Sequence, residues 1–117
     1  MEMEDFKWVG APGEVELRQL VESGSCKPLK DKKKVVRYIR FGSTIAWTLH
    51  VPFDVLEPDV MIGSESILSD GEWAWHKSFA YYIKKYDVPI HDEFLQKVRR
   101  NRYRIGIRNR LKLLFNR

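Results

Sequence analysis

The chain has 117 residues, of which 44% are hydrophobic, and a formal net charge of +5, which fits one globular domain and excludes a chain disordered throughout. A single cysteine, Cys26, excludes an intramolecular disulfide, and no apolar run approaches the roughly 18 residues of a membrane span. The acidic N-terminus lacks the basic and apolar order of a secretory signal, so we expect a cytoplasmic protein without a membrane span.

The first 26 residues predict a loose lead-in followed by one helix. Residues 1–11 form the lead-in, with Phe6 and Trp8 as its expected anchors. Pro12 suits the first turn of a helix because it has no N–H to leave unsatisfied. The apolar face of this helix is only partly regular and consists of Val15, Leu17, Leu20 and Val21. Gly24 is suited to end the helix in the left-handed conformation.

A first β-hairpin is predicted after the lysine-rich linker at residues 27–34. Residues 35–41 are β-branched and aromatic and show some alternation, which favours a strand. Gly42 and Ser43 form a two-residue turn signal, and residues 44–49 are expected to return as the second strand.

A second β-hairpin is predicted around Asp70 and Gly71, a strong turn signal. Residues 61–68 are expected to form one strand that is broken at Gly63, and residues 72–75 the other. Trp73 and Trp75 are two positions apart, so they share one face of that strand. We expect them in the core, although exposed tryptophans could instead stack on bases or fill a pocket of a partner.

Two helices are predicted next, over residues 77–86 and from Asp92 onward, because apolar residues recur at helical spacing. Residues 104–115 carry an apolar stripe and either continue the second helix or form another. The chain is therefore expected to be a single α+β domain over residues 1–117. It would have an N-terminal helix, a central antiparallel sheet built from two hairpins, and C-terminal helices packed on one face.

Three short motifs resemble a known group of proteins. They are DGxWxW at residues 70–75, AYY at 80–82 and EF at 93–94. Over residues 17–98 the chain is similar to small, largely uncharacterised bacterial proteins with this signature. It departs from them at His76 and His91, where the group has proline. Some members are similar to immunity proteins of polymorphic or contact-dependent inhibition toxin systems. The resemblance implies an immunity-type protein that neutralises a cognate toxin by occluding its active site.

Residues 51–72 carry six acidic groups and no basic ones. A nuclease toxin has a basic cleft for its own substrate, so acidic side chains on an inhibitor would compete for that cleft and accelerate capture. The candidate toxin-binding residues are Asp54, Glu57, Asp59 and Glu65. The alternative is that Asp70 serves its turn and the other acidic groups pair with local lysines.

Residues 99–117 carry eight basic groups and no acidic ones. They suggest an alternative function in nucleic-acid binding, because basic side chains bind phosphates. The candidate residues are Arg99, Arg100, Arg102, Arg104, Arg108, Arg110 and Lys112. An amphipathic basic helix of this kind can also lie on an anionic membrane, enter a partner's groove or pack on its own domain.

The sequence offers no pattern that is typical of catalysis. His50, His76 and His91 do not make the spacing of a metal site. Cys26 has no identified base, and no glycine-rich phosphate loop is present. We therefore expect a binding protein rather than an enzyme, without a metal or another cofactor.

Overall fold

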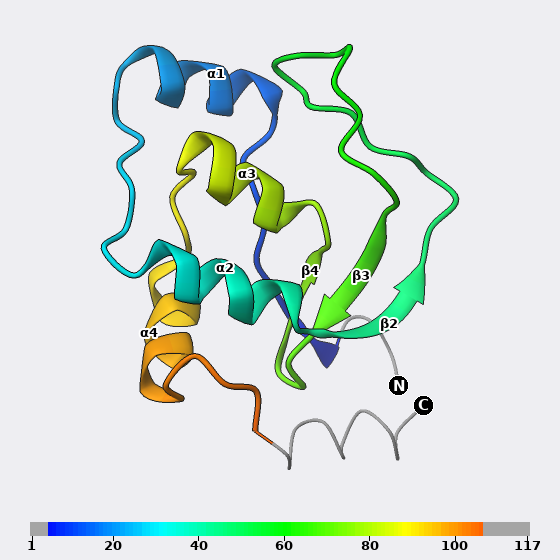
Figure 1. Cartoon of the computed structure of the whole chain (residues 1–117), viewed down its shortest axis with the longest axis vertical. Coiled ribbons are helices and arrows are strands. Elements are labelled where there is room, and N and C mark those ends of the chain that lie inside the picture. Colours follow the sequence, from blue (N-terminus) through cyan, green and yellow to red (C-terminus); the bar gives the residue numbers. More distant parts are fainter. Residues whose placement is uncertain (1–4, 107–117) are drawn as a thin grey trace.

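The structure, a computed structural model, describes residues 5–106. They form an α+β fold, which confirms the predicted class (Figure 1). The elements in chain order are β1 (Lys7–Trp8), α1 (Glu14–Glu22), α2 (Lys32–Arg40), β2 (Ser43–Trp47), β3 (Ser66–Ser69), β4 (Trp73–His76), α3 (Phe79–Tyr86) and α4 (Asp92–Arg100). No helix among the described residues has the length and apolar character needed to cross a membrane.

The four strands form one mixed sheet in the order β1-β4-β3-β2. Strand β3 is antiparallel to both β2 and β4, while β1 is parallel to β4. The tight turn between β3 and β4 is the hairpin predicted at Asp70 and Gly71. Oδ1 of Asp70 accepts the amides of Glu72 at 2.9 Å and Trp73 at 2.8 Å, and Gly71 has a φ of 103° that favours glycine.

The strand predicted over residues 35–41 is wrong, because this segment is helix α2. Its buried side chains are Val35, Val36, Tyr38 and Ile39. Two adjacent pairs separated by one exposed residue match the period of a helix and not that of a strand. The β-branched and aromatic composition favoured a strand, but burial of this stripe against the sheet determines the conformation. Consequently β2 pairs with β3 across the long loop 48–65, and not with residues 35–41.

Gly42 serves a close approach between the end of α2 and the sheet, and not a hairpin turn. A Cβ at this position would lie 2.7 Å from Cζ2 of Trp75 and 3.0 Å from Cβ of Leu68. The indole of Trp75 also donates a hydrogen bond of 3.0 Å to the carbonyl of Ile39. The end of α2 is therefore in direct contact with Trp75, the most buried tryptophan.

Replacing Gly42 by alanine is expected to lower the free energy of unfolding by about 1–3 kcal/mol, since the added methyl overpacks the contact with Trp75. Gly10→Ala is the matched control, because nothing lies within 4 Å of a Cβ built there. Urea denaturation of both variants measures the difference. Equal stabilities would contradict the packing described for Gly42.

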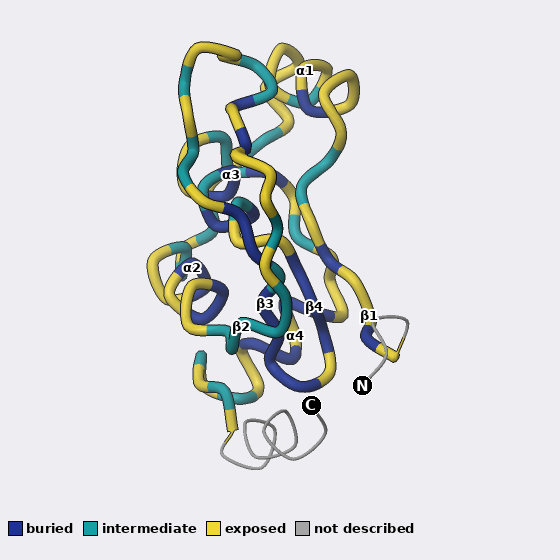
Figure 2. The backbone as a smooth tube through the Cα atoms, turned by 90° about the vertical axis from the view of Figure 1, so that its right-hand side faces the viewer, coloured by how far each residue is buried: buried dark blue, intermediate teal, exposed yellow. Residues whose placement is uncertain are grey.

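The main core lies between one face of the sheet and the helices. Phe94 of α4 lies between Trp73 and Trp75, with its ring centroid 5.4 Å from each indole. Helices α2 and α3 contribute Ile39 and Phe79 to the same cluster. Figure 2 shows β3 and β4 as the buried centre of the molecule. Both tryptophans are thus core residues, as predicted.

The lead-in at residues 1–11 is held to the sheet over part of its length. Residues 7 and 8 form β1, with the Lys7 amide donating to the Glu72 carbonyl at 3.0 Å and the Val9 amide to the Ala74 carbonyl at 3.1 Å. Phe6 is buried with Ala74 on the face of the sheet opposite to the main core. A strand of two residues is too short to produce a recognisable period in the sequence.

At the other end, α4 is followed by two residues with positive φ, Arg102 at 55° and Tyr103 at 62°. Residues 104–106 are not helical. The remainder of the helix expected over residues 104–115 lies outside the described part of the chain.

Candidate functional site

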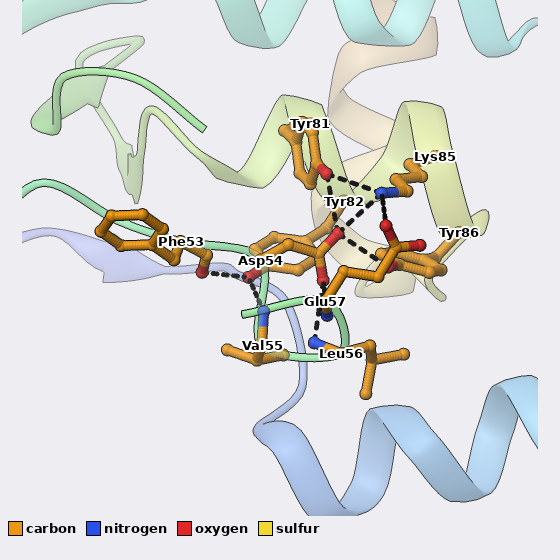
Figure 3. A network of polar contacts seen from close by, with 9 residues as sticks. All are labelled: Phe53, Asp54, Val55, Leu56, Glu57, Tyr81, Tyr82, Lys85 and Tyr86. Carbon is orange, nitrogen blue, oxygen red and sulfur yellow. Dashed lines mark hydrogen bonds and ion pairs between the residues drawn. The ribbon is translucent and has the colours of Figure 1, made fainter. Parts of the chain in front are cut away.

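Asp54 lies at the centre of a buried polar network that fixes the loop 48–65 to α3 (Figure 3). Its side chain is 1% exposed. Oδ1 accepts the amides of Leu56 at 2.8 Å and Glu57 at 3.1 Å, which closes a turn in the loop. Oδ2 accepts from three side chains of α3: Tyr81 at 2.7 Å, Lys85 at 3.0 Å and Tyr86 at 2.7 Å. The carboxylate therefore receives five donors.

The spacing of residues on α3 explains how one helix supplies so many of these donors. Tyr81 and Lys85 are four positions apart and are therefore neighbours on the surface of the helix, and Tyr86 follows Lys85 as the last residue of α3. Tyr82, beside them, accepts the Val55 amide at 3.1 Å through its hydroxyl. The two tyrosines of the AYY motif, together with Lys85 and Tyr86, thus hold the loop against α3.

The charge of Asp54 is strongly stabilised in the folded state. Burial alone would raise its pKa, but hydrogen bonds from Tyr86, Tyr81, the Leu56 amide and Lys85 outweigh burial and hold the pKa well below its usual value. The same contacts act on the partners. The pKa of Lys85 is raised by its hydrogen bonds to Tyr81 and Asp54, and the pKa of Tyr86 is raised by burial and by Asp54.

Glu65 is a second buried carboxylate, and it binds the N-terminus of α3. Its side chain is 6% exposed. Oε1 accepts the amides of Ser66 at 3.2 Å and Ser78 at 3.1 Å, and Oε2 accepts the Ser78 hydroxyl at 2.8 Å. The side chain of Ser78, at the N-terminus of α3, does not cap the helix. The carboxylate of Glu65 supplies the hydrogen-bond acceptor there instead.

The predicted toxin-binding surface is therefore smaller than the sequence suggested. Asp54 and Glu65 are buried and fully engaged inside the fold, so they are not available to a partner. Glu57 is exposed and forms an ion pair of 3.3 Å with Lys85. Asp59 is exposed at the tip of the loop. Of the four candidates, only Glu57 and Asp59 can contact another molecule.

A third buried acidic group, Asp70, pairs with a lysine that the sequence analysis did not single out. Lys97 of α4 is 6% exposed. Its ammonium forms ion pairs with Asp70 at 3.1 Å and Glu72 at 2.9 Å, and Tyr38 of α2 donates a hydrogen bond to Asp70. The cluster joins the β3–β4 turn to two helices, which is a structural role.

Large apolar side chains remain exposed along β2 and the loop that follows it. We call this set the apolar strip: Trp47, Leu49, Val51, Phe53 and Met61, with exposed fractions of 75%, 104%, 45%, 48% and 62%. The first four occupy alternate positions, and Phe53 forms a β-bridge with Met61. Among residues 5–106, strand β2 is an edge of the sheet, and edge strands are places where another chain can pair. The sequence predicted a strand here but gave no signal that Trp47 at its end stays in solvent.

The basic tail is partly engaged within the fold. Arg99 binds Asp31 through two nitrogens, at 2.9 and 3.0 Å, and Tyr103 donates to the same carboxylate at 2.6 Å. These contacts, that of Arg99 above all, lower the pKa of Asp31 to about 2. Arg100, Arg102 and Arg104 are exposed. Arg108, Arg110 and Lys112 lie outside the described residues, so the hypothesis of nucleic-acid binding by the tail stays a prediction.

The histidines do not form a recognisable reactive group. His50 and His76 line the same hollow of about 420 Å³, next to Glu65. Both oxygens of Glu65 are already bonded to Ser66 and Ser78. Within residues 5–106, no three histidine, cysteine or acidic side chains lie close enough together to hold a metal ion.

No protein-family model matches the chain, and the comparisons with curated proteins and with solved structures found no match. The similarity of residues 17–98 to small bacterial proteins therefore stays a prediction. The apolar strip, together with the two exposed acidic residues of the same loop, is the candidate functional site.

Proposed function

We propose that the chain is an immunity-type protein that binds a cognate protein toxin and blocks its active site. The observation that carries this proposal is the apolar strip. Exposed apolar patches on an otherwise polar surface mark sites of protein association, and tryptophan is enriched among the residues that dominate binding energy. Other aromatic side chains of the domain are used in the core, where three rings surround Phe94. Trp47, by contrast, stays exposed outside that core.

Strand β2 lies at the edge of the sheet within residues 5–106, so residues 45–47 offer a second means of attachment. An extended segment of a partner can pair with such an edge through backbone hydrogen bonds, while the side chains of the strip supply apolar contacts. The Asp54 network supports this role, because it holds the loop that carries Phe53 and Met61 in one position on α3.

Charge favours a basic partner at this site. Asp59 lies between Phe53 and Met61 in the loop and has no ion-pair partner among the described residues. Acidic groups beside an apolar contact accelerate capture of a basic surface such as the cleft of a nuclease. Blocking that cleft would neutralise the toxin without any chemistry by the inhibitor.

The test compares the wild-type chain with a variant carrying Trp47→Ser and Phe53→Ser. Tagged protein is incubated with a lysate of its own host and washed at high salt, and any stoichiometric protein is identified and produced alone. We expect this protein to arrest growth unless the wild-type chain is co-expressed. The double substitution is expected to weaken the affinity at least tenfold, because buried aromatic side chains contribute most of the energy of such interfaces.

A variant with Val15→Ser and Val21→Ser is the matched control, since both valines are exposed on α1. It should retain the partner. A retained protein that is harmless to the cell, or one that is bound equally well by all three forms, would overturn the proposal.

A further inference from the structure

A hollow outside the apolar strip lies beside α3. It has a volume of about 770 Å³, and its other walls are the end of α2 and residues 62–64. Sites for small ligands typically have volumes of about 300–1,000 Å³. Figure 1 shows α2 and α3 side by side, so that both helices contribute to one concave surface. The hollow therefore has the size and the walls of a small-molecule site.

The charge of this hollow is of one sign. Four basic side chains line it, and no acidic side chain of the described residues does. One of the four, Lys85, is neutralised by its ion pair with Asp54 at 3.0 Å (Figure 3). The other three form no ion pair within residues 5–106: Arg40 at the end of α2, Lys77 between β4 and α3, and Lys84 on α3. Cations of three separate segments thus face one concave surface, where their potentials add.

The hydroxyl groups of the hollow also favour an anion. Lys77 donates a hydrogen bond of 3.3 Å from Nζ to Oγ of Ser64, which leaves the hydroxyl proton of Ser64 for an acceptor on a ligand. The hydroxyl of Tyr81 is not available in this way, because it already donates to Asp54 at 2.7 Å. A ligand therefore meets three cations and one hydroxyl donor.

The ligand that suits these donors is a compact group with several negative charges. A phosphate monoester carries about −1.5 to −2 charges at pH 7, and a diphosphate adds further charge within a few bonds. A guanidinium such as that of Arg40 binds two oxygens of one phosphate at once. Ile62 and Ala80 also line the hollow and supply an apolar wall for the organic part of the ligand.

We propose that this hollow binds the diphosphate group of a small organic ligand, with Arg40, Lys77 and Lys84 on the phosphate oxygens. The site shares no residue with the apolar strip or with Glu57 and Asp59. The proposal is therefore independent of the toxin hypothesis. It does not use the basic tail either.

The experiment is isothermal titration of the full-length chain with inorganic pyrophosphate, for which we expect one site per chain. The variant with Lys77→Gln and Lys84→Gln should bind at least about tenfold more weakly, because two charge-assisted contacts are lost. Arg40→Lys keeps the charge but loses the two-pronged contact, so it should weaken binding about threefold or more. All three side chains are exposed, and urea denaturation checks that the variants remain folded.

The matched control is Lys33→Gln with Arg37→Gln, which removes the same charge from exposed positions on α2. Both residues line a neighbouring hollow of about 740 Å³ but not the proposed site. Arg40 and Lys84 line both hollows, so the control separates a compact ligand from a long polyanion that follows α2. It should retain the affinity for pyrophosphate. A loss as large as that of the Lys77 and Lys84 variant would overturn the proposal.

Two other anions test the chemistry of the ligand. Citrate spreads its carboxylates over a carbon skeleton and should bind at least about fivefold more weakly than pyrophosphate. A 12-nucleotide oligouridine without a terminal phosphate should not displace pyrophosphate at an equal concentration of phosphate groups. Equal binding of citrate would identify an unselective anion site, and displacement by oligouridine would identify a nucleic-acid surface. Either result, or no binding of pyrophosphate at millimolar concentration, would refute a diphosphate site.

Discussion

Replacing Asp54 by alanine is expected to lower the free energy of unfolding by about 3–5 kcal/mol, a large part of the total stability of a small domain. The substitution leaves the side chains of Tyr81, Lys85 and Tyr86 without their common acceptor. It also removes the acceptor of two loop amides. The unsatisfied donors account for most of the loss, because Lys85 keeps its ion pair with Glu57. Chemical denaturation of the purified variant measures it.

The same variant tests the role of the carboxylate charge through its pH dependence. Because the pKa of Asp54 is lowered in the folded state, its contribution to stability is present above its ordinary pKa of about 3.9 and is lost as the pH falls below that value. Between about pH 4 and pH 2, the stability of Asp54→Ala should fall less steeply than that of the wild type, by up to about 1.4 kcal/mol per pH unit. Asp31 and Glu72, whose pKa values are also lowered, remain in both forms.

Asp59→Ala is the control for this prediction, as it removes an exposed carboxylate of the same loop. We expect it to change stability by no more than about 0.5 kcal/mol. A loss of the same small size for Asp54→Ala would show that the network does not hold the loop.

Replacing Lys97 by alanine is expected to cost about 3 kcal/mol, because it leaves the fully buried Asp70 without its counter-ion. The three hydrogen bonds that Asp70 accepts from Tyr38, Glu72 and Trp73 limit the loss. Since the pair is buried, the difference from the wild type should persist in about 1 M salt, where exposed ion pairs are screened. Thermal and urea unfolding at low and high salt provide the measurement.

Arg100→Ala is the matched control for Lys97, since it removes a basic side chain that is exposed on the same helix. It should leave stability almost unchanged. If high salt abolished the effect of Lys97→Ala, the pair would behave as a solvated one, and its assignment as a buried link between α4 and the turn would be wrong.

The sequence predicted those elements whose signals are local. The Asp70–Gly71 turn carries its own hydrogen-bonding side chain, and the apolar period of α3 and α4 is regular. The sequence predicts a strand at α2 because β-branched residues over only seven positions fit either a strand or a helix. The local feature that favours the helix is the two adjacent pairs, Val35 with Val36 and Tyr38 with Ile39. Strand β1 depends on β4, and no pattern within two residues could reveal that pairing.

The site was predictable only in part, because burial of a charged residue is decided by distant partners. Asp54 and Glu57 lie three positions apart in one acidic segment, yet one is buried and the other exposed. The side-chain donors that make burial of Asp54 possible are 27 to 32 positions away.

The parallel pairing of β1 with β4 bears on the order in which the protein assembles on the ribosome. Residue 7 is synthesised before its partner, residue 73, so β1 has to wait until β4 has been made. Contacts this distant in sequence form late, because the loop they close costs entropy before the pairing rewards it. Until then Phe6 and the outer edge of β4 remain open to other chains. The nascent domain thus passes through a stage in which β1 has no partner strand, and in which premature association is the characteristic hazard.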